Sequence, residues 1–564
     1  MDNWRNMVAA IALALAIMLG WPYVTRYFFP AANPPATKIE DGRSVPLPTP
    51  ATEKPAELRD RAVVLRDAPR VPIDTPRLKG SINLKGARID DLELVQYRQT
   101  IAKNAPAVQL FSPAGTTDAY FAGFGWTGDG VGLPGPDTVW TAQGSLLAPG
   151  KPVTLSWDNG QGQRFTIKLS IDPGYMITAE QSVTNGGGGA FAARPLALVS
   201  RAGHSKDPDT WTIHTGPIGA INGKVDYDVN FTDLDEAGAG GVRFATKGGW
   251  IGFTDKYWLA AVVPDQAASV DAAFFATGPL NYQAISSGTA AIVQPGKVIR
   301  QTSRLYAGAK EVALLDDYED KLGIAHFGKA IDWGWFEIFE KPIFYVLDWL
   351  FKLTKNFGVA IILLTLIVRG LMFPIAQKQF ASMAAMRVVQ PKMKELQERY
   401  KDDKQKLQQE MLALYQKEKV NPLAGCLPMF LQIPIFYALY KVLMLTIEMR
   451  HQPFALWIKD LSAPDPMTPV NLFGLLPFSP PAFIAIGVLP ILLGITMYLQ
   501  FKLNPTPMDP VQQQVFSIMP WIFMFIMAPF AAGLQLYWTV SNLLTIAQQK
   551  WLYSRHAGLT EAKT

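Results

Sequence analysis

The sequence predicts a multi-domain membrane protein with an N-terminal transmembrane anchor, a large all-β domain outside the cytosol, and a C-terminal α-helical bundle carrying a cytosolic helical hairpin. Three observations predict this class. The chain has 564 residues, too many for one domain. Its charged residues, 18% of the total, are concentrated in blocks between apolar runs of membrane length. A long middle block instead shows the short alternating pattern of β-strands.

The first element is a predicted anchor over residues 1–29. Met7 to Leu19 is apolar, Arg5 precedes it, and the aromatic cluster WPYVTRYFFP follows at the position of a headgroup-level belt. The whole segment is long enough to span a bilayer with its N-terminus in the cytosol. A cleaved signal peptide is the alternative. Either interpretation places the next part of the chain outside the cytosol.

Residues 30–57 are rich in proline and scattered charge, a composition that favours extended conformers and predicts a tether. From 58 to 325 the sequence pattern changes to short alternating runs such as PVTLSWD, RFTIKLSID and WLAAVVP. Glycine, asparagine and proline separate these runs. These runs predict the strands of a large antiparallel β-sandwich with a buried core.

Residues 326–341 follow the β block and are predicted to form an amphipathic helix. Phe327, Ile331, Trp335 and Phe339 recur every four residues, with charged residues between them. The aromatic content favours a helix lying along the outer membrane–water interface. A helix packed on the β domain is the alternative.

The next membrane segment, from 357 to 377, contains a permanently charged side chain. Arg369 lies eight residues, or ~12 Å of helix, before Gln377, too deep to reach water easily. An arginine near a helix centre costs ~2.5 to 3.5 kcal/mol on insertion scales, so it usually faces protein or a wet cavity. Thr365 lies one turn earlier on the same face. The alternative is an arginine that reaches a thinned interface and has no role.

Residues 377–421 hold ten lysines and arginines against six acids, which predicts a cytosolic location. Two helical patterns, joined by a turn at Asp402 and Asp403, predict an antiparallel hairpin. A solvated connector and a docking element for partners or substrate both remain open for this hairpin.

The remaining predicted spans complete a core over 342–553, followed by a cytosolic tail at 554–564. With the anchor, the chain then has six spans and both termini inside. The four spans after the arginine helix are predicted at Leu423–Leu445, Phe483–Leu499, Val515–Phe530 and Gly533–Gln548.

The spans contain polar side chains but no acidic ones after residue 357, which disfavours a proton- or sodium-driven carrier. No Walker motif or intramembrane histidine is present, so we predict no catalytic residues and no enzyme. The single cysteine and five dispersed histidines predict no metal and no cofactor. No basic block is interleaved with aromatics, so nucleic acid is not an expected partner. The polar positions are Thr365, Arg369, Gln432, Gln535, Thr539, Ser541 and Asn542.

Several local motifs resemble one family. LLTLIVRG at 363–370, YQKEKVNPLAGCLP at 415–428, MFLQIPIFYALY at 429–440, FALWIKDLSAPDP at 454–466 and AGLQLYWTVSNLLTIAQQ at 532–549 are similar to YidC, the membrane protein insertase family of Gram-negative bacteria. The resemblance implies five core membrane helices, an N-terminal anchor and a periplasmic β-supersandwich, in the bacterial inner membrane.

The resemblance also implies a hydrophilic substrate groove and an adjoining hydrophobic slide. The groove positions fall on Arg369, Thr365, Gly358 and Gln432, and on Tyr537 and Trp538, where the family often has two tyrosines. The Trp538 indole N–H can still donate a hydrogen bond. The slide positions fall on Phe436 and Ile526.

The implied function is insertion and folding of inner-membrane proteins, alone or with the Sec translocon, without nucleotide hydrolysis. The implied partners are nascent membrane proteins and the lipid bilayer, with the ribosome or the signal recognition particle receptor as candidates for the hairpin and tail. Two other classes stay open: a small-solute or lipid transporter, and a membrane assembly scaffold.

Overall fold

The structure is a computed structural model, and its elements run from β1 to α11. The predicted anchor and most of the predicted tether lie outside the described residues. Backbone is described for residues 37–40, 43–46, 58–207, 213–400, 403–418, 427–473, 475–476, 478, 481, 485–503 and 510–555. Within these ranges the side chains at 37–46, 378–388, 390, 404, 427–432, 510–513, 516 and 553–555 are not described.

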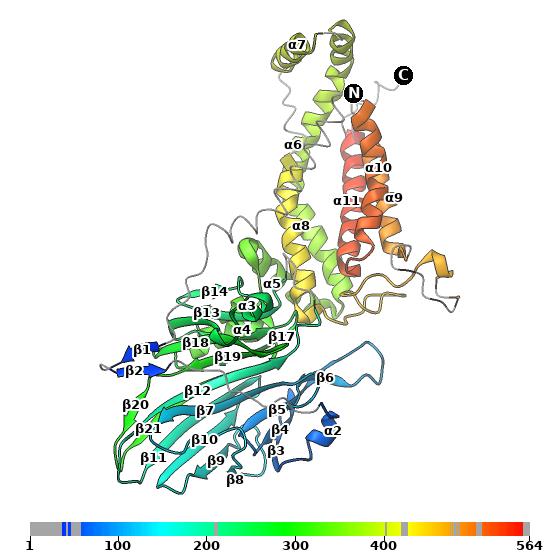
Figure 1. Cartoon of the computed structure of the whole chain (residues 1–564). Helices are drawn as coiled ribbons and strands as arrows, with labels where there is room; N and C mark the ends of the chain where they lie inside the picture. The colour runs from blue at the N-terminus through cyan, green and yellow to red at the C-terminus, as the bar shows by residue number, and fades with distance from the viewer. Residues whose placement is uncertain are drawn as a thin grey trace.

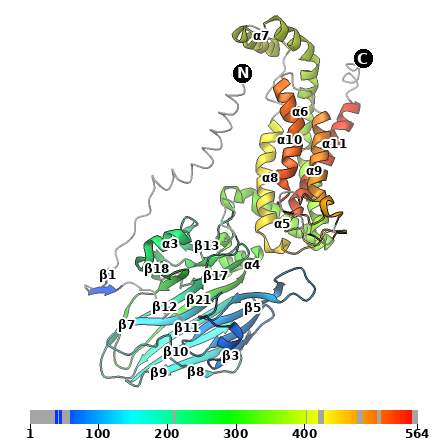
Figure 2. The same cartoon turned by 45° about the vertical axis from the view of Figure 1, so that its right-hand side comes forward.

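The β part and the helical part are distinct regions of the structure that contact each other at one end of the helices (Figure 1). The strands lie below the helices, and the helices stand roughly parallel to one another above them. α6 (Phe357–Arg399) extends beyond its neighbours and carries α7 (Lys404–Lys417) at its far end. The turned view in Figure 2 shows the same separation.

The β part contains two large antiparallel sheets, which confirms the predicted sandwich class. One sheet has the order β14 (Lys224–Asp226), β13 (Gly216–Ile221), β16 (Trp250–Thr254), β17 (Trp258–Val263), β21 (Val298–Ala309), β11 (Met176–Asn185), β10 (Gln163–Ile171), β9 (Val153–Asp158), β8 (Thr141–Gln143). The other has the order β15 (Val242–Lys247), β18 (Ser269–Gly278), β19 (Asn281–Ser287), β12 (Phe191–Ala202), β7 (Tyr120–Asp129), β5 (Arg88–Arg98), β4 (Leu78–Asn83), β3 (Arg70–Asp74), with β20 (Ala291–Val293) beside β12 and β6 (Ala107–Phe111) beside β5. A separate pair joins β1 (Thr37–Glu40) to β2 (Arg43–Pro46).

The sandwich core follows from the alternation of the strands. In β10, Phe165, Ile167 and Leu169 are buried, while the residues between them are partly or fully exposed. This period of two places every second side chain between the sheets. β21 pairs with both β11 and β17, so the closing strand of the domain lies inside the sheet rather than at its edge.

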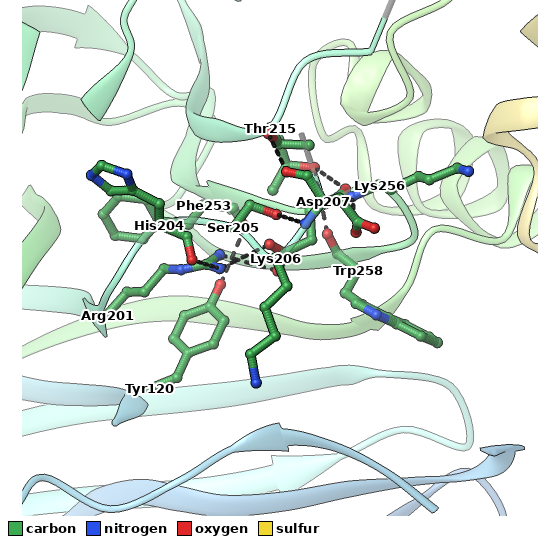
Figure 3. Close-up of polar contacts among 12 residues, drawn as sticks. Tyr120, Arg201, His204, Ser205, Lys206, Asp207, Thr215, Phe253, Lys256 and Trp258 are labelled. Carbon is green, nitrogen blue, oxygen red and sulfur yellow. Dashed lines mark hydrogen bonds and ion pairs between the residues drawn. The ribbon is translucent and has the colours of Figure 1, made fainter. Parts of the chain in front are cut away.

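A polar cluster holds the loop that follows β12 in the β domain (Figure 3). The Arg201 guanidinium makes two hydrogen bonds with Asp255, at 2.9 and 3.1 Å, and a third to the His204 carbonyl at 3.2 Å. The guanidinium also lies over the Tyr120 ring, 5.1 Å from its centroid. Arg201 and Asp255 are both buried, so the pair joins β12 to the end of β16 away from water.

The segment between the domains differs from the predicted amphipathic helix over 326–341. It contains two 3-10 turns, η2 (Phe327–Ala330) and η3 (Gly334–Phe336), and the helix α5 begins later and runs from Glu337 to Thr354. Phe327 is fully buried against aromatic rings of the β domain, whereas Trp335 is 94% exposed. The apolar residues spaced by four therefore do not share one helix face, since Phe327 is in the core of the β domain and Trp335 is at the surface. Tertiary packing overrides the four-residue spacing.

The helical elements have the following bounds. The small ones are α2 (Arg61–Val64), α3 (Phe231–Ala237), η1 (Gly238–Gly240), α4 (Val312–Leu322), η5 (Ile447–Met449) and η6 (Pro469–Asn471). After α6 and α7 the long ones are α8 (Leu427–Leu445), α9 (Val488–Leu503), α10 (Pro510–Met527) and α11 (Ala532–Arg555). In the described part, one segment is long and apolar enough to cross a membrane by itself, Phe357–Gln377, with 21 residues. Shorter apolar helices lie at Ile433–Leu445, Val488–Leu503 and Ser517–Met527, so the count of six spans stays a prediction.

α6 is one continuous helix of 43 residues, not a span followed by a separate hairpin helix. At ~1.5 Å per residue it is about 65 Å long. Its last turns pack against α7, where Val389 and Met393 contact Met411, Leu414 and Tyr415. The Lys392 ammonium also lies 2.7 Å from the Glu418 carboxylate. The predicted hairpin therefore forms between the end of α6 and α7.

Candidate functional site

Arg369 lies on α6 and reaches the neighbouring helix α11. Its Nε donates a hydrogen bond to the Ser541 hydroxyl at 3.1 Å, and its Nη2 contacts the same oxygen. Arg369 is half-buried and Ser541 is buried. The Tyr537 phenol, one helical turn from Ser541 on α11, is also close enough to Arg369 to interact electrostatically.

The charge on Arg369 has no ion-pair partner among the described residues. No carboxylate lies within 4.0 Å of its guanidinium there, and the described helices α8 to α11 contain no acidic residue. A cation bonded to a neutral hydroxyl keeps its net charge, so its field extends to any group that approaches its accessible side.

Thr365 does not extend the polar contact of Arg369. Its hydroxyl donates to the Ile361 carbonyl at 2.7 Å, one turn back on α6, and the side chain is fully buried. On α11, Asn542 and Gln535 bind other partners, and the buried Thr539 hydroxyl has no hydrogen-bond partner in the described structure. Asn542 donates to Thr496 of α9 at 3.2 Å, and the Gln535 amide donates to carbonyls at the end of α10. Asn542 and Gln535 thus bind partners other than Arg369, whereas Ser541 accepts hydrogen bonds from its guanidinium.

Trp538 lies in an aromatic cluster beside this polar pair. Its ring centroid is 4.5 Å from that of Phe436 on α8 and 5.2 Å from that of Phe523 on α10. The structure thus places Trp538, a predicted groove residue, in contact with Phe436, a predicted slide residue. Phe523, which the sequence reasoning missed, completes the cluster, and its only sequence signal was its place in an aromatic-rich span.

Ile526 and Gly358, two other predicted positions, are not part of this aromatic cluster. Ile526 is 52% exposed on the outer face of α10. Gly358 is the second residue of α6, eleven residues or ~16 Å of helix before Arg369, and is covered by the Phe454 ring. The structure therefore does not bring Gly358 together with Arg369. The Gln432 side chain lies outside the described residues.

A fully buried cation among the core helices, Lys441 on α8, was missed by the sequence reasoning. Its ammonium donates to the Asp332 carbonyl and lies 3.4 Å from the Asp332 carboxylate. Lys441 is fully buried and paired with a carboxylate, whereas Arg369 has no carboxylate partner among the described residues. In the sequence, the signal that could have indicated this buried cation was a lysine inside a short apolar segment, Ile433–Leu445. Among the described residues, no three metal-ligating side chains gather into a candidate metal site.

A β-sandwich joined to apolar helices, one of them of membrane length and holding an arginine with no carboxylate partner among the described residues, is the architecture of a membrane protein with a large water-exposed domain. Two family models match the chain in the same order. The YidC periplasmic domain matches residues 70–346, and the 60Kd inner membrane protein matches residues 349–559.

Full-length relatives match as well. The membrane protein insertase YidC of Zymomonas mobilis subsp. mobilis is 51% identical, with 98% of this chain and 96% of the relative covered. That of Methylobacterium nodulans is 47% identical with the same coverage. Among solved structures, an active YidC insertase aligns over 95% of this chain and 98% of its own, at 18% identity and a TM-score of 0.36. The chain belongs to the YidC family of membrane protein insertases, which are inner-membrane proteins with a periplasmic domain.

Proposed function

We propose that this insertase draws the polar, extracytosolic end of a nascent membrane protein into a hydrophilic groove at Arg369 while the apolar segment passes sideways into lipid. The observation that carries the proposal is the guanidinium of Arg369, which lies in the one membrane-length apolar helix of the described residues and is hydrogen-bonded there to the neutral Ser541 hydroxyl. A charge held in this way is available to an incoming acidic or polar segment.

The energy of such an attraction depends on the local dielectric. Two opposite charges 4 Å apart attract by ~1 kcal/mol in water and by ~4 kcal/mol at an effective dielectric constant of 20. Arg369 is half-buried between α6 and α11, so its surroundings are closer to the second case. The attraction lowers the barrier for the client's polar end without nucleotide hydrolysis.

Hydrophobic partitioning supplies the driving force for release into lipid. Each Å² of apolar surface removed from water is worth ~25 cal/mol. The aromatic cluster of Phe436, Phe523 and Trp538 lies beside Tyr537, next to the arginine contact. We propose that this cluster, with the exposed Ile526, forms the apolar path. The path places an apolar surface where a client helix leaves the polar site.

The proposal also includes orientation and partners. Both termini, the α6–α7 hairpin and the tail would face the cytosol, and the chain would span the membrane six times. The basic hairpin and tail suit contacts with the ribosome or the signal recognition particle receptor, and the helical core suits cooperation with the Sec translocon.

The charge mechanism is tested with purified full-length protein in liposomes and a two-span client with an acidic extracytosolic loop. We expect Arg369→Ala to lower insertion severalfold, Arg369→Glu to lower it further, and Arg369→Lys to retain much of it. Ser517→Ala is the control, since Ser517 is exposed on α10 and its hydroxyl binds only the Gln514 carbonyl in the described structure. Undiminished insertion by both Arg369→Ala and Arg369→Glu would exclude this mechanism.

A further inference from the structure

The loop between α8 and α9 exposes a run of large apolar side chains outside any helix of membrane length. Three of them are more than half exposed: Leu472 at 53%, Phe473 at 51% and Leu475 at 82%. Val470, Leu476 and Phe478 are exposed as well. We call Val470 to Phe478 the apolar loop, for its described residues only. Water-exposed loops rarely gather so many apolar side chains without a partner.

The charge pattern around the loop excludes a strongly hydrated surface. Asp465 is the last charged residue before it, and the next one, Lys502, lies near the far end of α9. The whole intervening stretch is uncharged. A partner that recognises charge would find no charged group here to bind. An apolar phase could contact the exposed apolar side chains directly.

The backbone of the loop satisfies several of its own polar groups. Phe473 N donates to the Thr468 carbonyl at 2.9 Å, Leu476 N to the Asn471 carbonyl at 3.1 Å, and Phe478 N to the Leu476 carbonyl at 2.9 Å. Backbone amides with internal acceptors lose little when they leave water. This compact turn is therefore suited to the boundary between headgroups and acyl chains, though not to the middle of the bilayer.

The loop holds its apolar side chains outward in an unfavourable backbone conformation. Leu472 and Phe473 have φ values of 50° and 60°, a left-handed region that bulky side chains rarely adopt. Such positions persist where the surroundings impose them, and they often mark functional segments.

The base of the loop is rigid. The buried Asp465 carboxylate accepts hydrogen bonds from the Trp457 indole at 2.9 Å, from Met467 N at 3.0 Å and from Leu489 N at 2.7 Å. These hydrogen bonds connect the chain segment that leads into the loop to the start of α9. The apolar side chains thus project from a fixed platform.

The position of the loop identifies the apolar phase. Figures 1 and 2 place the segment between α8 and α9 at the end of the helices that faces the β domain, at the level of α5. α5 also exposes large apolar residues there, including Ile338 at 76% and Trp349 at 59%. If the helices cross the bilayer, this level is its outer surface.

We propose that the apolar loop inserts into the outer leaflet, at the headgroup–acyl boundary, as a shallow anchor opposite the cytosolic hairpin. The occupant is lipid. The proposal does not depend on the role of Arg369, because it concerns how the helical core is held in the membrane.

The test measures the depth of a fluorescent label on the full-length protein in phosphatidylcholine–phosphatidylglycerol vesicles. In a Cys426→Ser background, Leu475→Cys carries an environment-sensitive label, and Leu475 is exposed enough for the change to leave packing intact. We expect the emission of the fluorophore to be blue-shifted. We also expect spin-labelled lipids to quench it strongly, and more when the spin label is near the headgroup than when it is at the end of the acyl chain. Lys459→Cys, exposed in the same loop region, should be quenched severalfold less.

A second variant separates insertion from misfolding. Leu472→Asp together with Phe473→Asp should reduce quenching at the residue 475 label severalfold while the circular dichroism spectrum stays unchanged. Emission at 475 equal to that at 459 would place the loop in water and overturn the proposal. A blue shift without lipid quenching would also overturn it, since the loop would then be covered by protein.

Discussion

The Nε of Arg369 lies 3.1 Å from the hydroxyl oxygen of Ser541, so a hydrogen bond joins the charged helix α6 to the last helix α11. Two donors of the guanidinium converge on that oxygen. The fork geometry of arginine makes such a contact directional. Ser541 therefore positions the charge without neutralising it.

The first prediction concerns this positioning role. Ser541→Ala removes the acceptor, and a hydrogen bond to a charged group is worth ~1.5–3 kcal/mol. We expect insertion of an acidic client to fall to a level between wild type and Arg369→Ala, while Ser541→Thr, which keeps the hydroxyl, retains most of it. The measurement is the liposome assay described above. A Ser541→Ala protein that loses thermal stability but inserts normally would assign the residue to packing alone.

How much of this site the sequence could predict depends on the residue. Arg369 was predictable because a charge within a membrane-length apolar run is rare and costly. Its partner was not, because Ser541 was one of several polar residues on α11 and the rotation of one helix against another depends on packing. The long-range contact between Phe327 and the β domain was equally invisible, since a four-residue repeat describes a helix and not what it packs against. A strand such as β10 was recognisable from its alternation, because every second side chain is buried.

The second prediction concerns Gly358, where the structure favours a packing role. A Cβ added there would overlap the Phe454 ring and lie 2.7 Å from its Cβ, and the Phe454 carbonyl is fixed by a 2.8 Å hydrogen bond from Asn356. Overpacking of this kind costs ~1–3 kcal/mol. We expect Gly358→Ala to lower the thermal unfolding temperature of the purified protein in detergent.

Gly370, twelve residues later on α6, is the matched control for Gly358. A Cβ at Gly370 meets nothing within 4 Å, so Gly370→Ala should leave stability unchanged or raise it by up to ~1 kcal/mol. Combining Gly358→Ala with Phe454→Ala should recover part of the loss. Insertion defects in Gly358→Ala without any loss of stability would instead support the groove assignment.

The third prediction concerns the buried ion pair of Arg201 and Asp255. Asp255→Ala leaves the Arg201 guanidinium buried without its carboxylate, and breaking such a pair typically costs ~3–5 kcal/mol. We expect a large drop in the denaturant midpoint of the β domain, followed by tryptophan fluorescence. Lys206–Asp118 provides the comparison, because this ion pair at 3.3 Å is solvent-exposed and Asp118→Ala should cost ~0–1 kcal/mol. Equal effects of the two substitutions would contradict the role assigned to burial.

The fourth prediction concerns pH and the contact between the two domains. Glu448, in the loop after α8, accepts a hydrogen bond from the backbone N–H of Val312 at the start of α4, at 3.1 Å. Its other carboxylate oxygen is buried without a hydrogen-bond partner in the described structure. Burial raises the pKa of Glu448 to about 8, and the nearby carboxylates of Glu311 and Asp348 raise it as well.

The sign of the pH effect follows from proton binding. Between an unfolded pKa near 4.5 and a folded pKa of about 8, the folded state holds the extra proton, so this contribution to stability is present at low pH and is lost as the pH rises. One proton corresponds to a slope of up to ~1.4 kcal/mol per pH unit. We expect the unfolding free energy of wild type to fall between pH 5 and 8 more steeply than that of Glu448→Gln, which keeps the acceptor for Val312 N. Asp74→Asn, an exposed change on β3, should leave the slope as in wild type. Parallel pH profiles for wild type and Glu448→Gln would show that the carboxylate is ionised at the domain contact throughout this range.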